Sequence, residues 1–357
     1  MKRSWSTVGM VILIAALLAA CGAAREQGTR QDGTTNAAPG GVTNEAANDS
    51  GAPAQDEQTS TDGREAAETT KEQTTATQVL ETVMGDVAIP VEPERVIGLS
   101  VVYPELLYAL GVVPVAVQNY HDEFPSYLGD GLADTLKMGI DRTPDFEAIL
   151  SADPDLILAP AWWSEKDYDQ LSSIAPTVLL PQRDDWRDEL RDIAAVFGKE
   201  AQAATVIAEL QAKTDEAAAQ LDELIGDETV LYMRIMAKEI VVHGPSSARG
   251  KLIHEELGLA PVPQLPQAEN ARSISLEVLP EYDADHFIIQ LDDESSEEVQ
   301  SQFERMLSSA LWDKLTAVQQ DHLYMVEGKD WFNVGMSPLA DSAAIDTVVE
   351  ALEHKQP

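Results

Sequence analysis

Two glutamates recur at matching points in the two halves of the chain. Glu147 opens a Glu-x5-Asp-x-Asp pattern that recurs from Glu277, at an offset of 130 residues, and each copy leads into an apolar segment. We expect each glutamate in the first turn of a short helix, where a carboxylate offsets the helix dipole by about 0.3–1 kcal/mol. That role alone accounts for their positions. A second interpretation is that the two glutamates lie on the same rim of a two-lobed protein. Their carboxylates would then dock onto basic pockets of a two-fold symmetric partner.

Arg234 is the charged residue whose surroundings are most informative, because it lies inside the apolar segment 231–235. An unpaired guanidinium is costly there, so we expect a specific anionic partner. Either a neighbouring carboxylate forms a structural salt bridge with it, or the guanidinium addresses oxygen atoms of a bound ligand.

Aromatic residues follow several of the expected strands. Ligands of open α/β sheets bind beyond the carboxyl ends of the strands, where aromatic side chains offer large, rigid contact surfaces. We therefore predict that these residues line a cleft, although a place in the core or between lobes is the alternative for each of them. The candidates are Tyr120, Trp162, Trp163, Trp186 and Trp331.

Charge and motifs exclude several classes of function. The 357 residues carry a formal net charge of −38, which argues against nucleic acid as a partner. The chain has no Gly-x-Ser-x-Gly, His-Glu-x-x-His or phosphate-binding glycine loop, so we expect neither an enzyme nor a cofactor. Its six histidines are scattered without paired spacing, and a cluster of imidazoles that would bind a metal ion directly is not expected.

The chain begins like an exported protein. Lys2 and Arg3 precede an apolar run at 8–20 that is too short to cross a bilayer. The run ends in Leu-Ala-Ala-Cys-Gly, which resembles a bacterial lipobox with Cys21 as the lipidated residue. We therefore expect residues 1–21 to be a lipoprotein signal peptide, with a plain secretory signal as the alternative. Lipidation at Cys21 would hold the protein on the extracytoplasmic face of the cell membrane.

Residues 22–78 lack Leu, Ile, Phe, Trp and Tyr, and such a composition predicts a disordered acidic tether. Short apolar runs then alternate with helical patterns, which is typical of α/β units. A long helical stretch without proline lies between them. The predicted fold is therefore α/β, with two lobes bridged by a single long helix and a ligand cleft between the lobes. The expected parts are an N-terminal lobe at 79–185, a helical segment at 186–226 and a C-terminal lobe at 227–357.

Several motifs, taken in order, are similar to those of iron-siderophore substrate-binding lipoproteins of ABC importers, the class III periplasmic binding proteins with a helical backbone. The resemblance covers nearly all of residues 80–355, and the order of the motifs makes the set specific. The motifs are Met84-Gly85-Asp86-Val87-Ala88-Ile89-Pro90, Pro93-Glu94-Arg95-Val96-Ile97, Met138-Gly139, Pro144-Asp145-Phe146-Glu147, Asp153-Pro154-Asp155-Leu156-Ile157-Leu158, Phe197-Gly198-Lys199, Ser275-Leu276-Glu277, Leu311-Trp312 and Leu323-Tyr324.

This resemblance implies a monomer that holds an iron(III)-siderophore complex between its lobes and passes it to a permease dimer. It implies that one glutamate per lobe engages arginines of the permease, at positions that match Glu147 and Glu277. Members that bind ferric hydroxamates carry an arginine near Arg234 with an aromatic residue shortly before it, a place that Tyr232 fills here. The iron would be held by the siderophore, with no direct protein ligand.

The charge of the chain favours one class of siderophore. Binders of trianionic ferric catecholates are expected to place several basic residues in the cleft, and the segments near the expected strand ends offer few. A neutral or cationic ferric hydroxamate fits the acidic body better. Cobalamin or heme bound by the same fold, and a bare metal ion, are the alternatives.

Overall fold

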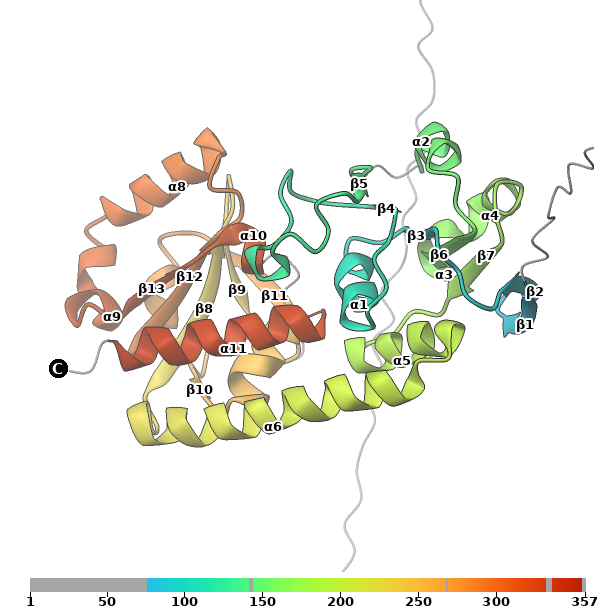
Figure 1. Ribbon diagram of the computed structural model, residues 1–357. Coiled ribbons are helices and arrows are strands. Elements are labelled where there is room, and N and C mark those ends of the chain that lie inside the picture. Colours follow the sequence, from blue (N-terminus) through green and yellow to red (C-terminus); the bar gives the residue numbers. More distant parts are fainter. Residues whose placement is uncertain (1–75, 141–143, 268, 332–335, 355–357) are drawn as a thin grey trace, which may run out of the picture. The chain divides into compact units, whose positions relative to one another are not determined.

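The computed structural model describes residues 76–140, 144–267, 269–331 and 336–354, all of which belong to one structural unit, Thr70–Pro357 (Figure 1). The predicted signal peptide, its Cys21 and almost all of the predicted tether lie outside the described residues. The tether was expected to extend to residue 78, but the first strand already begins at Thr77.

The N-terminal lobe is built on a five-stranded parallel sheet with the order β5-β4-β3-β6-β7. All five residues of β6 are buried, which is typical of a parallel sheet covered on both faces. A hairpin, β1 (Thr77–Thr82) and β2 (Gly85–Pro90), precedes the sheet. The sheet strands are β3 (Val96–Gly98), β4 (Ala116–Val117), β5 (Leu136–Lys137), β6 (Leu156–Pro160) and β7 (Thr177–Leu180); the helices are α1 (Tyr103–Ala109), α2 (Phe146–Ser151), α3 (Ala161–Ser164) and α4 (Tyr168–Ser172), with 3-10 turns at Ser126–Leu128 and Glu165–Asp167.

The C-terminal lobe has a mixed sheet with the order β11-β9-β8-β12-β13, and β10 pairs with the start of β8. β8, β12 and β13 are parallel, whereas β9 runs antiparallel to both β8 and β11. The carboxyl ends of β8, β11, β12 and β13 therefore lie at one edge. The strands are β8 (Thr229–Ile235), β9 (Ile240–His243), β10 (Ala260–Pro261), β11 (Ala271–Ile274), β12 (His286–Leu291) and β13 (Leu323–Val326); the helices are α7 (Ala248–Lys251), α8 (Glu297–Leu307), α9 (Thr316–Gln319) and α10 (Gly328–Trp331), with a π-helical turn at Leu252–Glu256 and 3-10 turns at Leu279–Tyr282 and Trp312–Lys314.

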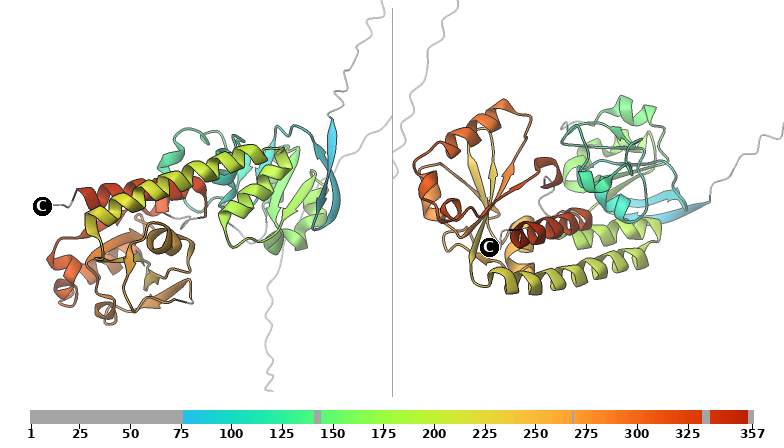
Figure 2. Two further views of the ribbon diagram at one scale, coloured as in Figure 1. Left: turned by 90° about the horizontal axis from the view of Figure 1, so that it is seen from below. Right: turned by 60° about the vertical axis from the view of Figure 1, so that its left-hand side comes forward.

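Helices connect the two lobes. α5 (Trp186–Phe197) ends at Gly198, whose φ of 61° lies in the left-handed region that glycine adopts without strain. α6 (Glu200–Ile225) follows and spans about 39 Å at 1.5 Å per residue. The C-terminal α11 (Pro338–Glu353) lies along α6, as both views of Figure 2 show. The predicted bridging helix is confirmed. None of the helices in the described part of the chain is long and apolar enough to span a membrane.

A single buried cluster joins the lobes to these helices. It contains residues from the N-terminal lobe, such as Leu106, from α6, such as Leu221, and from the C-terminal sheet, such as Tyr232. Two smaller clusters fill the other face of each sheet. Because the lobes share one core through the helices, movement between them must displace these helices together.

The repeated sequence pattern corresponds to a repeated structure at the centre of each lobe. β3 pairs with β6 in one lobe, and β8 pairs with β12 in the other, both in parallel. The Asp155 carboxylate, just before β6, accepts hydrogen bonds from the backbone N–H groups of Glu94 and Arg95 at 2.8 and 2.9 Å. Asp285, just before β12, accepts from the backbone N–H and the hydroxyl of Thr229 at 2.8 and 2.7 Å. Each aspartate thus ties two neighbouring strands together at their amino ends.

Candidate functional site

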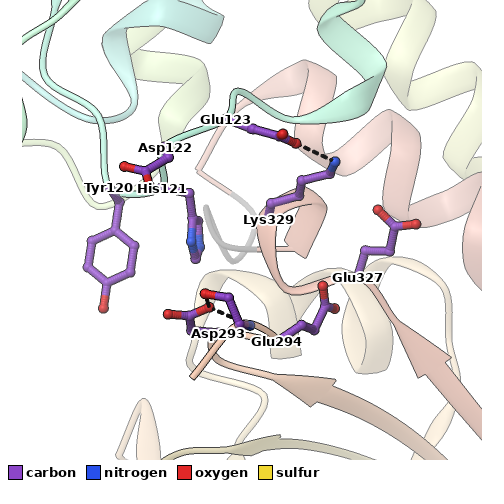
Figure 3. Close-up of a pocket in the computed structure, with 9 residues that line it drawn as sticks. Tyr120, His121, Asp122, Glu123, Asp293, Glu294, Glu327 and Lys329 are labelled. Carbon is purple, nitrogen blue, oxygen red and sulfur yellow. Dashed lines mark hydrogen bonds and ion pairs between the residues drawn. The ribbon is translucent and has the colours of Figure 1, made fainter. Parts of the chain in front are cut away.

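A pocket of about 720 Å³ lies between loops of the two lobes (Figure 3). One wall comes from the segment after β4 and the other from the segments after β12 and β13. All three strands belong to parallel parts of their sheets, so the pocket lies at the carboxyl ends, where ligands of such sheets bind. The lining residues are Tyr120, His121, Asp122, Glu123, Asp293, Glu294, Ser295, Glu327 and Lys329.

Close backbone packing positions the loop after β13. A Cβ atom at Gly328 would stand 2.3 Å from the carbonyl oxygen of Leu291, so only glycine allows this approach. The Gly328 N–H donates to a carboxylate oxygen of Glu294 at 2.8 Å. These contacts hold the end of β12 against the loop after β13, and they therefore set the backbone position of Lys329.

Two polar contacts connect the lobes beside the pocket. Lys329 Nζ lies 3.1 Å from a carboxylate oxygen of Glu123, as Figure 3 shows. The Asp330 carboxylate accepts hydrogen bonds from both the backbone N–H of Ser126, at 2.6 Å, and the Ser126 hydroxyl. Both contacts join the segment after β4 to α10, so they hold the two lobes together beside the pocket.

Carboxylates dominate the charge of the pocket. Five of its nine lining residues are Asp or Glu, against one lysine. Hydrogen bonds from Ser295 hold the pKa of Asp293 below its usual range, so this carboxylate stays ionised. Burial lowers the pKa of His121, which leaves its imidazole neutral at pH 7. The pocket therefore attracts a cationic ligand and repels an anionic one.

Arg234 has the anionic partner that its position in β8 requires. Its guanidinium pairs with the Asp292 carboxylate, and the Arg234 and Asp292 side chains are 15 and 14 % exposed. Asp292 directly precedes the pocket-lining Asp293, so the pair supports the wall of the pocket from behind. The structural salt bridge that the sequence left open is present, whereas a ligand contact of Arg234 stays a prediction.

Tyr232 and Trp331, both predicted to touch ligand, are buried and pack against each other with ring centroids 5.4 Å apart. Trp331 also lies under the guanidinium of Arg249, which is fully buried and 3.4 Å from the Asp341 carboxylate. Tyr232 stacks on His243 at 4.8 Å. In this conformation the two aromatic residues form a column behind the pocket and do not line it.

Trp162 and Trp163 form α3 directly after the carboxyl end of β6. Trp162 is 63 % exposed and meets Trp163 edge to face at 5.3 Å, which fits the expectation that at least one of the two is exposed. They line a separate hollow of about 380 Å³. β4 and β6 are two positions apart in the sheet, about 10 Å, and their carboxyl ends lie at the same edge. An extended ligand can therefore reach both the pocket after β4 and the hollow at Trp162 and Trp163.

Trp186 is not brought to the pocket. It opens α5, is buried, and donates its indole N–H to the Asp341 carboxylate at 2.8 Å. Its ring also lies beneath the guanidinium of Arg187. Trp186 therefore joins α5 to α11, and among the predicted aromatics only Tyr120, which is 44 % exposed, lines the pocket.

Glu147 and Glu277 are both exposed. Glu147 lies in the first turn of α2, as expected, but Glu277 lies in a turn before the 3-10 helix at Leu279–Tyr282 and not in a helix. A hydrogen bond from Ser275 lowers the pKa of Glu277 and keeps it ionised. Each glutamate follows the carboxyl end of a strand, β5 in one lobe and β11 in the other, which places both at corresponding edges of their sheets.

The acidic residues of the pocket were missed from the sequence, although a signal was present. Asp293 and Glu294 follow an apolar strand, and so does Glu327, which are the same strand-end positions that the predicted aromatic residues occupy. The rings of His286 and His322 are stacked 4.5 Å apart, a pairing that their scattered positions in the sequence did not indicate.

The model of the periplasmic binding protein family matches residues 96–329. The chain belongs to this family. The motif-based expectation is confirmed at this level. The chain is 30% identical over 263 residues to a probable siderophore-binding lipoprotein, YfiY, of Bacillus subtilis, a match that covers 69% of this chain and 79% of the relative. It is 27% identical over 279 residues to the iron(3+)-hydroxamate-binding protein FhuD of the same organism, over 75% of this chain and 84% of the relative.

Solved structures show the same fold. SirA of Staphylococcus aureus, in complex with staphyloferrin B, matches with a TM-score of 0.65 at 24% identity, over 78% of this chain and all of that one. FeuA of Bacillus subtilis, in complex with ferri-bacillibactin, matches with a TM-score of 0.64 at 23% identity, over 78% of this chain and 98% of that one. The two-lobed architecture with a long connecting helix is therefore shared with this family.

Proposed function

We propose that the protein captures a ferric siderophore outside the cytoplasm and delivers it to the permease of an ABC importer. The observation that carries this proposal is a pocket to which both lobes contribute, at the carboxyl ends of their parallel strands. Family membership supports it, as do relatives whose names describe siderophore and iron(3+)-hydroxamate binding. The function is binding and transfer without catalysis, and the iron stays in its chelate.

The charge of the pocket favours a neutral or cationic ferric hydroxamate. A trianionic catecholate complex would enter a space with five carboxylates and one lysine, and those carboxylates would repel it. A ferric hydroxamate with a free ammonium group would be attracted by the same carboxylates. The bound chelate would contact Tyr120 in the pocket, and a larger one would extend toward Trp162 and Trp163. Arg234 would reach the chelate only if its pair with Asp292 opened.

Delivery rests on two further parts of the chain. Lipidation of Cys21 would keep the monomer at the outer face of the cell membrane, close to the permease. Glu147 and Glu277, exposed at corresponding edges of the two lobes, would then pair with arginines of the two permease subunits. A matched pair of contacts suits a partner with two-fold symmetry.

The experiment is a titration of the purified full chain with ferrichrome (neutral), ferrioxamine B (cationic) and a ferric tris-catecholate, followed by tryptophan fluorescence. Trp331 lies beside the interlobe contact of Asp330 and reports on closure. We expect saturable quenching by both hydroxamates and at least tenfold weaker binding of the catecholate. Iron-free ligand, cobalamin and heme serve as comparisons, and an equal response to any of them would reject the assignment.

A pair of variants tests the role of charge. Asp122→Asn with Glu327→Gln removes two carboxylates from the pocket, and affinity for ferrioxamine B should fall about tenfold, or ~1.4 kcal/mol. Affinity for neutral ferrichrome should stay within a factor of two. Glu209→Gln, on an exposed position of α6, is the matched control. Equal losses for both chelates would mean that the carboxylates shape the pocket and do not select by charge.

A further inference from the structure

Three side chains with metal-binding atoms converge at the edge of the C-terminal sheet that lies opposite the pocket. Glu228 precedes β8, His286 opens β12 and His322 precedes β13. One donor atom from each residue lies within 4.8 Å of the other two. The parallel pairing of β12 with β13 places the two histidines side by side, because Phe287 and Leu323, the residues that follow them, are partners in register. Figure 1 shows the three strands next to one another in the C-terminal lobe.

Hydrogen bonds fix the orientation of both imidazoles, and that of His322 already matches a metal site. Nδ1 of His322 lies 3.0 Å from the backbone carbonyl oxygen of Asp285, so it carries the proton and donates it. The lone pair of His322 is then on Nε2. Nε2 of His286 lies 2.6 Å from a carboxylate oxygen of Glu228 and donates its proton there, so Nδ1, 3.0 Å from the Tyr324 hydroxyl, accepts from that hydroxyl. An ion between Nε2 and Glu228 requires this proton to move to Nδ1, which then donates to the Tyr324 oxygen. Histidines that bind metals donate Nδ1–H to such oxygen acceptors and present Nε2 to the ion.

The site combines a fixed ligand with two adaptable ones. The His286 side chain is almost fully buried, with 4 % exposed, whereas that of Glu228 is 53 % exposed, which leaves a path for an ion from solvent. Zinc holds nitrogen and oxygen donors at about 2.0–2.2 Å, which sets them roughly 3.5 Å apart. The imidazole planes are now parallel to within 4°. Coordination therefore requires the partly exposed His322 ring to tilt out of the stack while it keeps its bond to Asp285.

We propose that Glu228, His286 and His322 bind one divalent transition-metal ion of the zinc class. Two imidazoles and a carboxylate are donors that suit Zn²⁺ and its neighbours, whereas Mg²⁺ and Ca²⁺ favour sites made of oxygen atoms. The ion would join the amino ends of β8, β12 and β13. Seven residues of extended chain separate His286 from Asp293, roughly 20 Å, so this site is distinct from the cleft that receives the ferric chelate.

The test is isothermal titration of the metal-free full chain with ZnCl₂. We expect this site to saturate at one zinc ion per chain. When the zinc concentration is a hundred times the dissociation constant, the melting temperature of the protein should rise by about 5 °C. His322→Ala and Glu228→Gln should each weaken binding at least tenfold. Both residues are partly or largely exposed, so these variants keep the fold even if substitution of the buried His286 does not.

An exposed pair at the carboxyl end of α11 provides the matched control: His354 Nε2 lies 3.7 Å from a carboxylate oxygen of Glu350, so the pair has the same two kinds of donor atom. His354→Ala should bind zinc like the unmodified chain. Cu²⁺ bound to the unmodified chain should show hyperfine coupling to two imidazole nitrogens in electron paramagnetic resonance, and His322→Ala should show one. Absence of zinc binding, or equal affinity in His322→Ala and the unmodified chain, would overturn the proposal.

Discussion

The two lobes share a frame but differ in what they present on it. Both have a central parallel strand pair tied by an aspartate at its amino end, and both carry an exposed glutamate after the carboxyl end of a strand. The sheets around these pairs differ, since that of the N-terminal lobe is wholly parallel and that of the C-terminal lobe contains antiparallel strands. The pocket loops differ further: the C-terminal lobe contributes Asp293, Glu294, Ser295, Glu327 and Lys329, whereas the N-terminal lobe contributes the two rings of Tyr120 and His121 beside Asp122 and Glu123.

This comparison separates two kinds of constraint. The features that both lobes keep fit a common strand pairing and the proposed docking to a two-fold symmetric permease. The features that differ surround the pocket, where the proposed cargo need not be symmetric. Equivalent substitutions in the two lobes should therefore have equal effects on docking and stability, and unequal effects on ligand binding.

The largest expected effect is on import. Glu147→Ala and Glu277→Ala should each reduce uptake of the ferric chelate at least tenfold in cells, and the double variant should abolish it, because each removes one of the two contacts proposed with the permease. Chelate affinity of the purified variants should not change. Uptake that survives in the double variant would leave both carboxylates with local structural roles only.

The aspartates at the strand starts come next. Asp155→Ala and Asp285→Ala each leave two hydrogen-bond donors without their acceptor, so each should lower the free energy of unfolding by about 1–3 kcal/mol. Urea denaturation followed by circular dichroism measures both. If one variant loses most of its stability and the other loses none, the lobes do not share the role that their repeated pattern suggests.

A smaller effect is expected where the lobes touch. Asp330→Ala removes the acceptor of both hydrogen bonds from Ser126. The closed arrangement loses stability, so release of the chelate should become about tenfold faster, equivalent to ~1.4 kcal/mol. Stopped-flow fluorescence measures the release rate, and Asp227→Ala, at an exposed position remote from these contacts, is the control. An unchanged rate would show that these contacts do not govern closure.

The smallest effect concerns pH. Burial raises the pKa of Glu189 in α5 from its ordinary 4.5 to about 7. The folded state therefore favours the protonated form, and stability should decline as the pH rises from about 4.5 to 7. Glu189→Gln should flatten that decline. A decline below pH 6 should remain, because burial also raises the pKa of Asp341 to about 6. Identical pH profiles of the variant and the unmodified chain would contradict the assignment to Glu189.

Much of the fold follows from local patterns in the sequence. The runs Thr177–Leu180, Thr229–Ile235 and Leu323–Val326 are mainly apolar, with Arg234 the one charged residue among them, and each forms a strand. The hairpin of β1 and β2 was missed because polar residues interrupt its apolar ones and all of its residues but Ile89 are exposed or half-buried. The turn that contains Glu277 was predicted to be the first turn of a helix. The prediction was wrong because a glutamate is compatible with either a helix or a turn at this position.

The site was less accessible to sequence reasoning, because it depends on strand order. His286 and His322 are 36 residues apart without a motif, and only the pairing of β12 with β13 brings them together. Likewise, the contact of Lys329 with Glu123 depends on the closure of the lobes. Tyr120 could be predicted to line the pocket because it follows the end of one strand, and recognising that strand requires no knowledge of the strand order.

The central claim is that cargo is held by both lobes at once, and hydrogen–deuterium exchange with and without ferrichrome tests it most directly. We expect ferrichrome to slow backbone exchange in residues 119–126 of the N-terminal lobe and also in residues 292–295 and 327–331 of the C-terminal lobe. Slower exchange confined to one lobe, or none in these three segments, would contradict the account.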